Sequence, residues 1–454
     1  MSNSAHPPSP RSSRQVLSVA WPLGLKAVMT HGLIAIDAYL VSPLGETALA
    51  AMGLAGSIGG LILGTLFAFS TATQIRVAQA YGSGNEVFIK SAFWLGLLIN
   101  AIVGLVGLSL AVLYADDILR SFAHTPEIAA QAQAYLNIFL LIVVAEIGNQ
   151  LLTSYFNGCG QTKTPFYSYL IIMPINVGLS LILIHGHFGL PAMGVAGAAV
   201  GSAVAAGIQA LYLGSRLYVK NRAFKGVQGW RNDTFILSLK RHLVFALPLA
   251  ATFFSVALTN NICTLMYAKL PVNQFAAKTL IMPWVHIAGT VGISWAQATG
   301  ITVAQLLGER QQGSTLDAFL KHSWKGAAIS AGIVSLIYLG IILASAVVYA
   351  GLQDETKATL WSFLPVLLLL PFPKTSNAMC GHSLRAGGDT VYVMNIFLSS
   401  QWLCKLPLTF AFIYWFEWSA TLVFMIFLIE ELFKFPLFHL RLLKGKWKEG
   451  PLDA

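Results

Sequence analysis

Apolar stretches that reach or approach the length of a membrane span recur along the whole chain. Examples are LILGTLFAFSTA, FWLGLLINAIVGLVGLSLAVL and AAISAGIVSLIYLGIILASAVVYA. A helix needs about 20 residues to cross about 30 Å of hydrocarbon. Hydrophobic residues make up 56% of the sequence and charged residues 10%, which is too apolar for a soluble globular protein. Strict alternation of apolar and polar residues, typical of a β-barrel, is absent. The sequence therefore predicts an all-α polytopic membrane protein.

We predict twelve membrane-spanning helices. They lie near residues 15–40, 47–72, 88–113, 128–154, 165–186, 192–217, 243–268, 273–299, 322–350, 357–381, 390–415 and 418–441. The polar residues 1–14, rich in Pro and Ser, are expected to form a disordered cytosolic tail. Because a full-length span follows this tail directly, no removable signal peptide is expected.

The basic residues outside these spans divide unequally between alternate loops. Arg120, Lys269 and Lys357 fall in one set of loops, whereas 20 others fall in the opposite set and the two tails. By the positive-inside rule both termini and the basic linker at 218–242 are cytosolic. The net charge of +10 therefore reflects orientation in a membrane. Binding of nucleic acid, which needs basic residues clustered on one face, is not expected. The remaining five of the 28 Lys and Arg lie within predicted spans: Lys26, Lys278, Lys374, Lys405 and Lys434.

Part of the sequence recurs at almost half the length of the chain. ATQIRVAQAYG at 72–82 returns as ATGITVAQLLG at 298–308, with seven identical residues, each 226 positions downstream. In the same way FNGCGQT at 156–162 aligns with LRAGGDT at 384–390, 228 positions downstream. We interpret the chain as two copies of one six-span unit.

The two copies define the expected domain organisation. An N-terminal lobe at 15–217 and a C-terminal lobe at 243–441 are joined by the basic linker, and a cytosolic tail follows at 442–454. Because six is an even number, both lobes enter the membrane in the same orientation. They would then be two six-helix bundles related by a pseudo-twofold axis along the membrane normal, an arrangement typical of transporters.

Several turn motifs resemble the multidrug and toxic compound extrusion (MATE) family. They are IRVAQAYGSGN, FNGCGQTKTP, GLPAMGVAGAAVGSAVA, LRAGGDT and the closing RLLKGKW, and the resemblance extends from about Trp21 to Trp447. It implies the MATE fold and a secondary antiporter that exports organic, often cationic, compounds in exchange for H⁺ or Na⁺. The loop motif of major-facilitator transporters and the GxxxxGK[ST] motif of ATPases are absent from the sequence. We expect no enzymatic activity.

Asp37 in the first span is the leading candidate for the coupling residue. A charged side chain inside a bilayer is costly, and burial of a carboxyl group favours its protonated form, which suits a proton carrier. The resemblance matches Asp37 to the first-helix aspartate that binds the coupling cation in MATE proteins, with Asn176, Ser180 and Ser202 as accompanying polar groups. At the 226 offset Asp37 corresponds to Cys263, so coupling is expected in the N-terminal lobe alone. The alternative is a solvated or capping aspartate at the outer end of the span.

Lys374 in the tenth span departs from the pattern of sodium-coupled family members. By resemblance, NorM-like members that use sodium carry carboxylates in spans seven and ten, where this chain has Ser255 and Lys374. A lysine repels sodium, so the sequence favours H⁺ over Na⁺. At the 228 offset Lys374 corresponds to Glu146. The two would form a switchable ion pair, or offer opposite charges to a zwitterionic or amphiphilic substrate. The equally weighted alternative is that each is neutralised within its own lobe.

Lys26 and His31 share the first span with Asp37. Lys26 lies eleven residues before Asp37, which puts the two within about 20° of a common helix face. Lys26 would modulate the acid or line the cytosolic part of the path, or it would extend toward the inner headgroups. His31 would relay protons, or pack as a neutral imidazole.

Two further groups of ionisable residues are interpreted as structural. Glu430 and Lys434 are four residues apart near the end of the last span, a spacing that predicts an ion pair on one helix face. His185 and His187 flank a glycine in a short outer loop. Two imidazoles alone are weak grounds for a metal site, so no metal and no cofactor other than the coupling ion is expected.

The sequence thus favours an H⁺-coupled exporter of the MATE type. We expect a monomer in the cell membrane (inner or plasma), with small-molecule substrates that are cationic or amphiphilic, and with membrane lipids around it. Two alternatives stay open. One is a flippase for a lipid-linked precursor, and the other is a non-transporting membrane scaffold that retains the fold.

Overall fold

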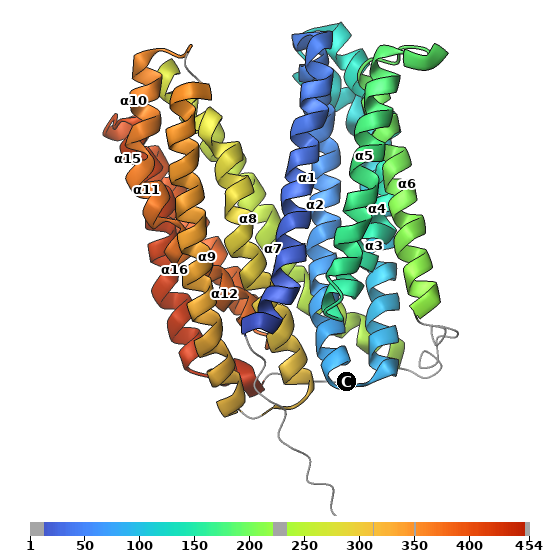
Figure 1. Ribbon diagram of the computed structural model, residues 1–454, viewed down its shortest axis with the longest axis vertical. Helices are drawn as coiled ribbons and strands as arrows, with labels where there is room; N and C mark the ends of the chain where they lie inside the picture. Colours follow the sequence, from blue (N-terminus) through green and yellow to red (C-terminus); the bar gives the residue numbers. More distant parts are fainter. Residues whose placement is uncertain (1–12, 221–233, 312, 349–350, 450–454) are drawn as a thin grey trace, which may run out of the picture. The chain divides into compact units, whose positions relative to one another are not determined.

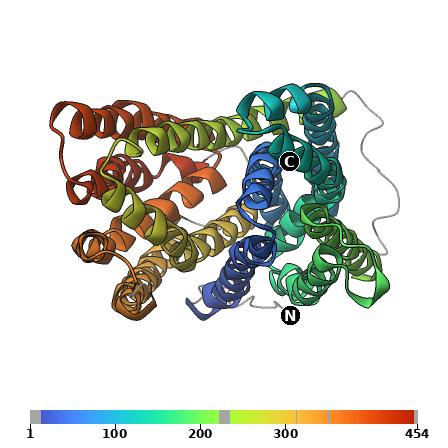
Figure 2. The ribbon, with the colours of Figure 1, turned by 90° about the horizontal axis from the view of Figure 1, so that it is seen from above.

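Helices make up all the regular structure of the described residues, which are 13–220, 234–311, 313–348 and 351–449 of a computed structural model. Figure 1 and Figure 2 show these helices, and no strand occurs among them. The predicted all-α class is confirmed. Ten helices in these ranges are long and apolar enough to cross a membrane, and one bent pair of helices adds an eleventh.

The chain divides by its internal contacts into two compact units. Unit 1 comprises Met1–Gly24, Gly82–Gly84 and Leu258–Asp453, and unit 2 comprises Leu25–Tyr81 and Asn85–Ala257. Two long helices, the first and the seventh of the chain, therefore contribute to both units. Of the predicted linker and tails, residues 221–233, 1–12 and 450–454 lie outside the described residues. The bounds of the two lobes stay a prediction.

Unit 2 contains the first six of the predicted spans. They correspond, to within a few residues, to α1 (Ser13–Val41), α2 (Glu46–Gly82), α3 (Glu86–Phe122), α4 (Pro126–Gly158), α5 (Lys163–His185) and α6 (Val195–Lys220), with short 3₁₀ turns at Ser42–Leu44 and His187–Gly189. Local chemistry fixes where some of these helices begin and end. The side chain of Asn85 accepts a hydrogen bond from the backbone N–H of Phe88 at 3.0 Å and caps the start of α3. Gly186, in the left-handed conformation with φ of 75°, ends α5.

Helices α5 and α6 pack closely because α6 carries glycines on the shared face. A Cβ added to Gly197 would lie 2.6 Å from the carbonyl carbon of Leu183, and one added to Gly201 would lie 2.5 Å from the hydroxyl oxygen of Ser180. No side chain larger than hydrogen fits at these positions unless the backbone moves. The close approach brings polar residues of the two helices within hydrogen-bonding distance of one another, as described below.

Unit 1 contains the remaining predicted spans. Its elements are the later part of α7 (Thr234–Tyr267), then α8 (Val272–Gly308), α9 (Gly313–Val348), α10 (Asp354–Ser362), α11 (Leu364–Leu369), α12 (Pro371–Ala386), α13 (Thr390–Ser399), η4 (Ser400–Lys405), α14 (Leu406–Phe410), η5 (Ala411–Trp415), α15 (Ala420–Phe424), α16 (Ile426–Leu443) and η6 (Lys446–Glu449). A buried apolar cluster that includes Tyr338, Phe363 and Phe424 holds α7 to α11 together with α15 and α16.

Two of the predicted spans in unit 1 are not simple apolar helices. The tenth is bent by 44° between Leu369 and Pro371, at a run that contains Pro371 and Pro373. Proline lacks the backbone N–H that an unbroken helix uses, which accounts for the bend. The twelfth, formed by α15 and α16, carries Glu430, Glu431, Lys434 and Arg441. Because of these charges, the twelfth predicted span is not among the helices that are apolar enough to cross a membrane by composition.

The eleventh predicted span, α13 to η5, contains two stretches of π-helix, η4 and η5. A π-helix inserts an extra residue per turn and often occurs at functional sites. In η4 the buried residues are Ser400, Gln401, Cys404 and Lys405, so this irregular turn directs a lysine into the interior of unit 1.

The sequence repeat is matched by equivalent packing in the two units. In unit 2, α4 packs against α3 and α6, and α5 packs against α6. In unit 1, α12 packs against α9 and α16, and α13 with η4 packs against α16. The third, fourth, fifth and sixth helices of each half thus have corresponding neighbours.

The close packing of α5 on α6 generates a testable prediction. We expect Gly197→Ala to lower the free energy of unfolding by about 1–3 kcal/mol, the usual effect of overpacking a tight contact. Thermal unfolding of the purified protein in detergent measures this as a lower Tm. Gly207→Ala on the same helix is the control, because no atom lies within 4 Å of a Cβ placed there. Equal Tm values for the two variants would contradict the predicted contact.

Candidate functional site

Asp37 lies in unit 2 on the later part of α1, half-buried. Its Oδ1 atom is buried and has no hydrogen-bond partner. In the part of the chain that the structure describes, the Asp37 side chain takes part in no ion pair. Tyr135 of α4 lies within electrostatic range of the carboxyl group. A buried carboxyl oxygen without a partner is costly, and binding of a proton or a cation would relieve that cost.

The other three predicted coupling residues lie together between α5 and α6. The amide of Asn176 donates a hydrogen bond to the hydroxyl oxygen of Ser202 at 2.8 Å. Ser180 is one turn after Asn176 and lies against Gly201, the residue before Ser202. The Asn176 Oδ1 and Ser180 Oγ atoms are buried without a partner. This cluster therefore offers free acceptor oxygens. No hydrogen bond joins it to Asp37 among the described residues.

Glu146 lies on α4 and is held by its own helix. Its Oε1 accepts from the amide of Asn149 at 3.0 Å and its Oε2 accepts from the amide of Gln150 at 2.9 Å. The opposite charge of Lys26 on α1 attracts it. The Lys26 ammonium also lies 5.1 Å from the centre of the Tyr169 ring. Lys26 thus belongs to the surroundings of Glu146, a neighbour that the sequence did not suggest.

His31 and Lys374 differ in their surroundings. His31 is exposed on α1. Lys374 is half-buried at the start of α12 in unit 1, within electrostatic range of Glu431 and Glu430. Glu146 and Lys374 therefore belong to different units, and each has opposite charges within its own unit. Their pairing across the units stays a prediction.

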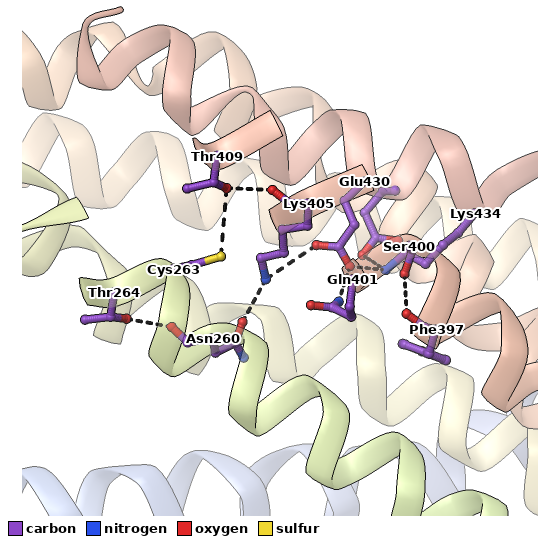
Figure 3. A network of polar contacts seen from close by, with 11 residues as sticks. Asn260, Cys263, Thr264, Phe397, Ser400, Gln401, Lys405, Thr409, Glu430 and Lys434 are labelled. Carbon is purple, nitrogen blue, oxygen red and sulfur yellow. Dashed lines mark hydrogen bonds and ion pairs between the residues drawn. The ribbon is translucent and has the colours of Figure 1, made fainter. Parts of the chain in front are cut away.

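A cluster of buried charges occupies the interior of unit 1 (Figure 3). The Lys434 ammonium donates to Glu430 Oε1 at 2.9 Å and to Glu431 Oε1 at 2.8 Å. The predicted ion pair between Glu430 and Lys434 is therefore present. Lys405 of η4 reaches the same cluster, with its Nζ 3.5 Å from Glu430 Oε2 and 2.7 Å from Asn260 Oδ1 of α7. We call Lys405, Glu430, Glu431 and Lys434 the charge cluster.

Amide side chains complete the charge cluster. Gln401 donates to Glu430 Oε1 at 2.6 Å, and Asn377 donates to Glu431 Oε2 at 2.9 Å. Three of the four carboxylate oxygens therefore accept hydrogen bonds, and the fourth, Glu430 Oε2, lies in the ion pair with Lys405. A buried carboxylate needs such partners to offset the loss of water. No oxygen of Glu430 or Glu431 is left without a partner, whereas the amide oxygens of Gln401 and Asn377 are buried and accept no hydrogen bond.

Sequence reasoning identified only part of this cluster. Lys405 was recognised as a lysine inside a span, and Glu430 with Lys434 as an ion pair. The contributions of Asn260, Gln401 and Asn377 were missed. A usable signal was the excess of lysine over acidic residues in the C-terminal spans, because every buried lysine needs acceptors. The sequence did not indicate which helix would supply these acceptors, because the π-helix η4 changes the direction in which Lys405 points.

The repeat relates the polar groups of the two units. Shifted by 228 positions, Ser202 corresponds to Glu430 and Asn176 to Cys404, the neighbour of Lys405. Both halves thus place a polar contact between their fifth and sixth helices: Asn176 with Ser202 in unit 2, and Lys405 with Glu430 in unit 1. The contact is neutral in unit 2 and charged in unit 1.

No group of three or more His, Cys, Asp or Glu side chains suited to a metal ion occurs within 13–220, 234–311, 313–348 and 351–449. The rings of His185 and His187 lie 5.9 Å apart, tilted against each other. All four cysteines are buried free thiols.

The charge cluster generates a second prediction. Lys434→Met removes the ammonium that bridges two buried carboxylates, and we expect it to lower the free energy of unfolding by about 3–5 kcal/mol. The yield of folded protein and its Tm in detergent measure the change. Lys444→Met, at an exposed position just after the same helix, is the control and should leave both unchanged. A Lys434→Met protein as stable as the control would show that the ion pairs do not stabilise unit 1.

Comparison with known proteins agrees with the architecture. A protein called "Probable multidrug resistance protein NorM" from Rhizobium meliloti is 27% identical over 281 residues, which are 60% of this chain and 58% of that relative. A protein of the same name from Bradyrhizobium diazoefficiens is 23% identical over 406 residues, 87% of this chain and 85% of that relative.

A solved structure described as "Outward-facing conformation of a multidrug resistance MATE family transporter of the MOP superfamily" matches with a TM-score of 0.83. It is 16% identical and the match covers 96% of this chain and 97% of that one. Such structures have twelve helices, in keeping with the twelve predicted spans. The family model MatE matches residues 22–182 and 248–411, one segment in each copy of the repeat. The chain therefore belongs to the MatE (MATE) family of multi-pass membrane transporters and is not an enzyme.

Proposed function

We propose that the chain is a secondary antiporter that exports small organic compounds in exchange for protons by alternating access. The observation that carries this proposal is the buried, unpartnered carboxyl oxygen of Asp37 in unit 2. An ionisable group inside a span is expensive to keep, and its functional use explains its presence. The names of the NorM relatives support multidrug efflux as the process served.

The repeat supports a coupling site shared by Asp37 and the α5–α6 cluster. In unit 1, Cys263, which corresponds to Asp37, has its sulfur 3.8 Å from the hydroxyl of Thr409, one turn after Lys405. The neighbouring Asn260 on the same helix accepts a hydrogen bond from Lys405 itself. By analogy, the helix that carries Asp37 faces Asn176 and Ser202 in unit 2. The free oxygens of Asn176 and Ser180 would then bind the proton on Asp37, directly or through water.

Coupling requires that the proton and the substrate prefer different states of the transporter. In our proposal, a proton that arrives from the outside binds Asp37 and favours release of the substrate. Loss of that proton to the cytosol resets the protein. Lys26 and Glu146, which attract each other near the same helix, would set the local potential along this route. His31 is an exposed candidate for delivering protons to it.

Sodium is the less favoured coupling ion. In unit 1 the carboxylates of Glu430 and Glu431 are already occupied by lysine and amide groups. Lys374 adds a further positive charge near them. A cation arriving there would meet repulsion and no free carboxylate oxygen. We further propose that the protein acts as a monomer in the cell (inner or plasma) membrane with both termini cytosolic.

The decisive experiment replaces Asp37 by asparagine in proteoliposomes. We expect ethidium efflux driven by an imposed pH gradient to fall to that of empty vesicles in Asp37→Asn, because the coupling proton has lost its carrier. Asp117→Asn, at an exposed position on α3, is the matched control and should transport like the unmodified protein. Undiminished efflux by Asp37→Asn would overturn the role of Asp37 in the proposal, whereas no gradient-driven efflux by the unmodified protein would leave the flippase or the scaffold as the function.

The choice of ion is tested separately. With pH equal on both sides, an imposed sodium gradient should give no efflux above background in the unmodified protein, since the carboxylates of unit 1 are occupied and Lys374 adds a repelling positive charge beside them. Efflux that follows the sodium gradient, measured with the same dye, would refute the preference for protons.

A further inference from the structure

Unit 1 contains more positive than negative charge in its interior. The charge cluster and its surroundings hold four lysines, Lys278, Lys374, Lys405 and Lys434, and two acids, Glu430 and Glu431. Lys434 and Lys405 are the two lysines that form ion pairs with these acids. The acids are therefore neutralised within the cluster, and two ammonium groups are left over.

The two remaining lysines are not equivalent. The Lys278 ammonium lies 3.6 Å from the centre of the Tyr267 ring, and such a contact partly replaces lost water. The Lys374 side chain has no hydrogen bond, ion pair or ring contact within the described ranges. Glu431 and Glu430 attract it from beyond ion-pair distance, while Lys434 and Lys405 repel it. Among the four lysines in and around the charge cluster, Lys374 is thus the one whose ammonium group has neither an ion-pair partner nor a ring contact in the described residues.

The position of Lys374 suits a binding site. It lies one turn before Asn377 on α12, so the two share a helix face, and Asn377 donates to the carboxylate of Glu431. Lys374 is therefore on the side of α12 that faces the charge cluster. It also lies in the first turn of α12, just after the 44° bend between α11 and α12. The side chain is only half-buried, so a ligand can reach it.

We propose that Lys374 binds the anionic group of a transported compound, so that the substrates include amphiphilic organic anions or zwitterions with a carboxylate, phosphate or sulfonate. This inference rests on the proposed transport function and deepens it. It adds a substrate class to the cationic compounds that the family resemblance suggested. An ammonium without a counter-ion inside apolar helices is unfavourable, and an anion supplied by the ligand removes that cost. The rest of the ligand must be apolar to enter the same surroundings.

The test measures binding to purified protein in nanodiscs of phosphatidylcholine, without any gradient. The probes share a naphthalene body: 2-naphthoate, 2-naphthyl phosphate and 2-naphthalenesulfonate as anions, and 2-naphthylmethylammonium as the cation. We expect at least one anion to bind more tightly than the cation. Lys374→Gln should weaken that binding about ten- to hundredfold, the contribution of one charged hydrogen bond, and leave the cation unaffected. Lys374→Arg keeps the charge and should retain the preference for anions.

Lys321→Gln, at an exposed position on α9, is the matched control and should bind like the unmodified protein. A Tm within the range of the control shows that Lys374→Gln is folded. If Lys374→Gln does not fold, the proposal is tested by Lys374→Arg, which should retain the preference for anions. Equal anion affinity in the unmodified protein and Lys374→Gln overturns the proposal, and so does the absence of binding by all three anions.

A second arm identifies the source of the anion. Nanodiscs that contain phosphatidylglycerol will weaken naphthoate binding to the unmodified protein if lipid headgroups occupy Lys374, and will leave it unchanged if the site serves soluble organic anions. Failure of this inference is distinguishable from failure of the proposed function. Binding is measured without a gradient, whereas the Asp37→Asn experiment measures gradient-driven efflux of ethidium.

Discussion

The low dielectric of a membrane interior is the constraint on which the rest of this structure depends. It makes every buried charge costly unless a partner compensates it. In unit 1 that cost is met by arranging Lys405 and Lys434 around Glu430 and Glu431, with further hydrogen bonds from the amides of Gln401 to Glu430 and of Asn377 to Glu431. The π-helix η4 carries Gln401 and Lys405, and α12, which begins after the 44° bend, carries Asn377.

The same constraint gives the two repeats different chemistry on a shared plan. Each half packs its fourth helix against its third and sixth, and each places a polar contact between its fifth and sixth helices. In unit 2 this contact is between neutral Asn176 and Ser202, and the nearby first helix keeps an acid, Asp37, with a free oxygen. In unit 1 the acids are saturated and a lysine is in excess. An antiporter arranged in this way would bind the proton at a single site in one half and the anionic group of the substrate at a single site in the other.

Several features were predictable from the sequence for identifiable reasons. The spans followed from length and hydrophobicity, and the bend in the tenth span followed from Pro371 and Pro373. The ion pair of Glu430 with Lys434 followed from their spacing on one helix. Lys26 beside Glu146, and Asn260 beside Lys405, were not predictable. These pairs join residues more than a hundred positions apart, and hydrophobic periodicity does not specify which helices are neighbours.

The sequence by itself determined that this chain is an all-α membrane protein with an internal repeat, because those properties depend on the order of apolar residues and on matched turns. It also singled out Asp37 and Lys374, since any ionisable residue inside an apolar run is conspicuous. Only the tertiary structure decided which of these charges have partners. The carboxylates of unit 1 are saturated, whereas Asp37 and Lys374 have no hydrogen-bond or ion-pair partner among the described residues. That distinction depends on contacts between distant helices at 3 to 4 Å, which packing sets and composition does not.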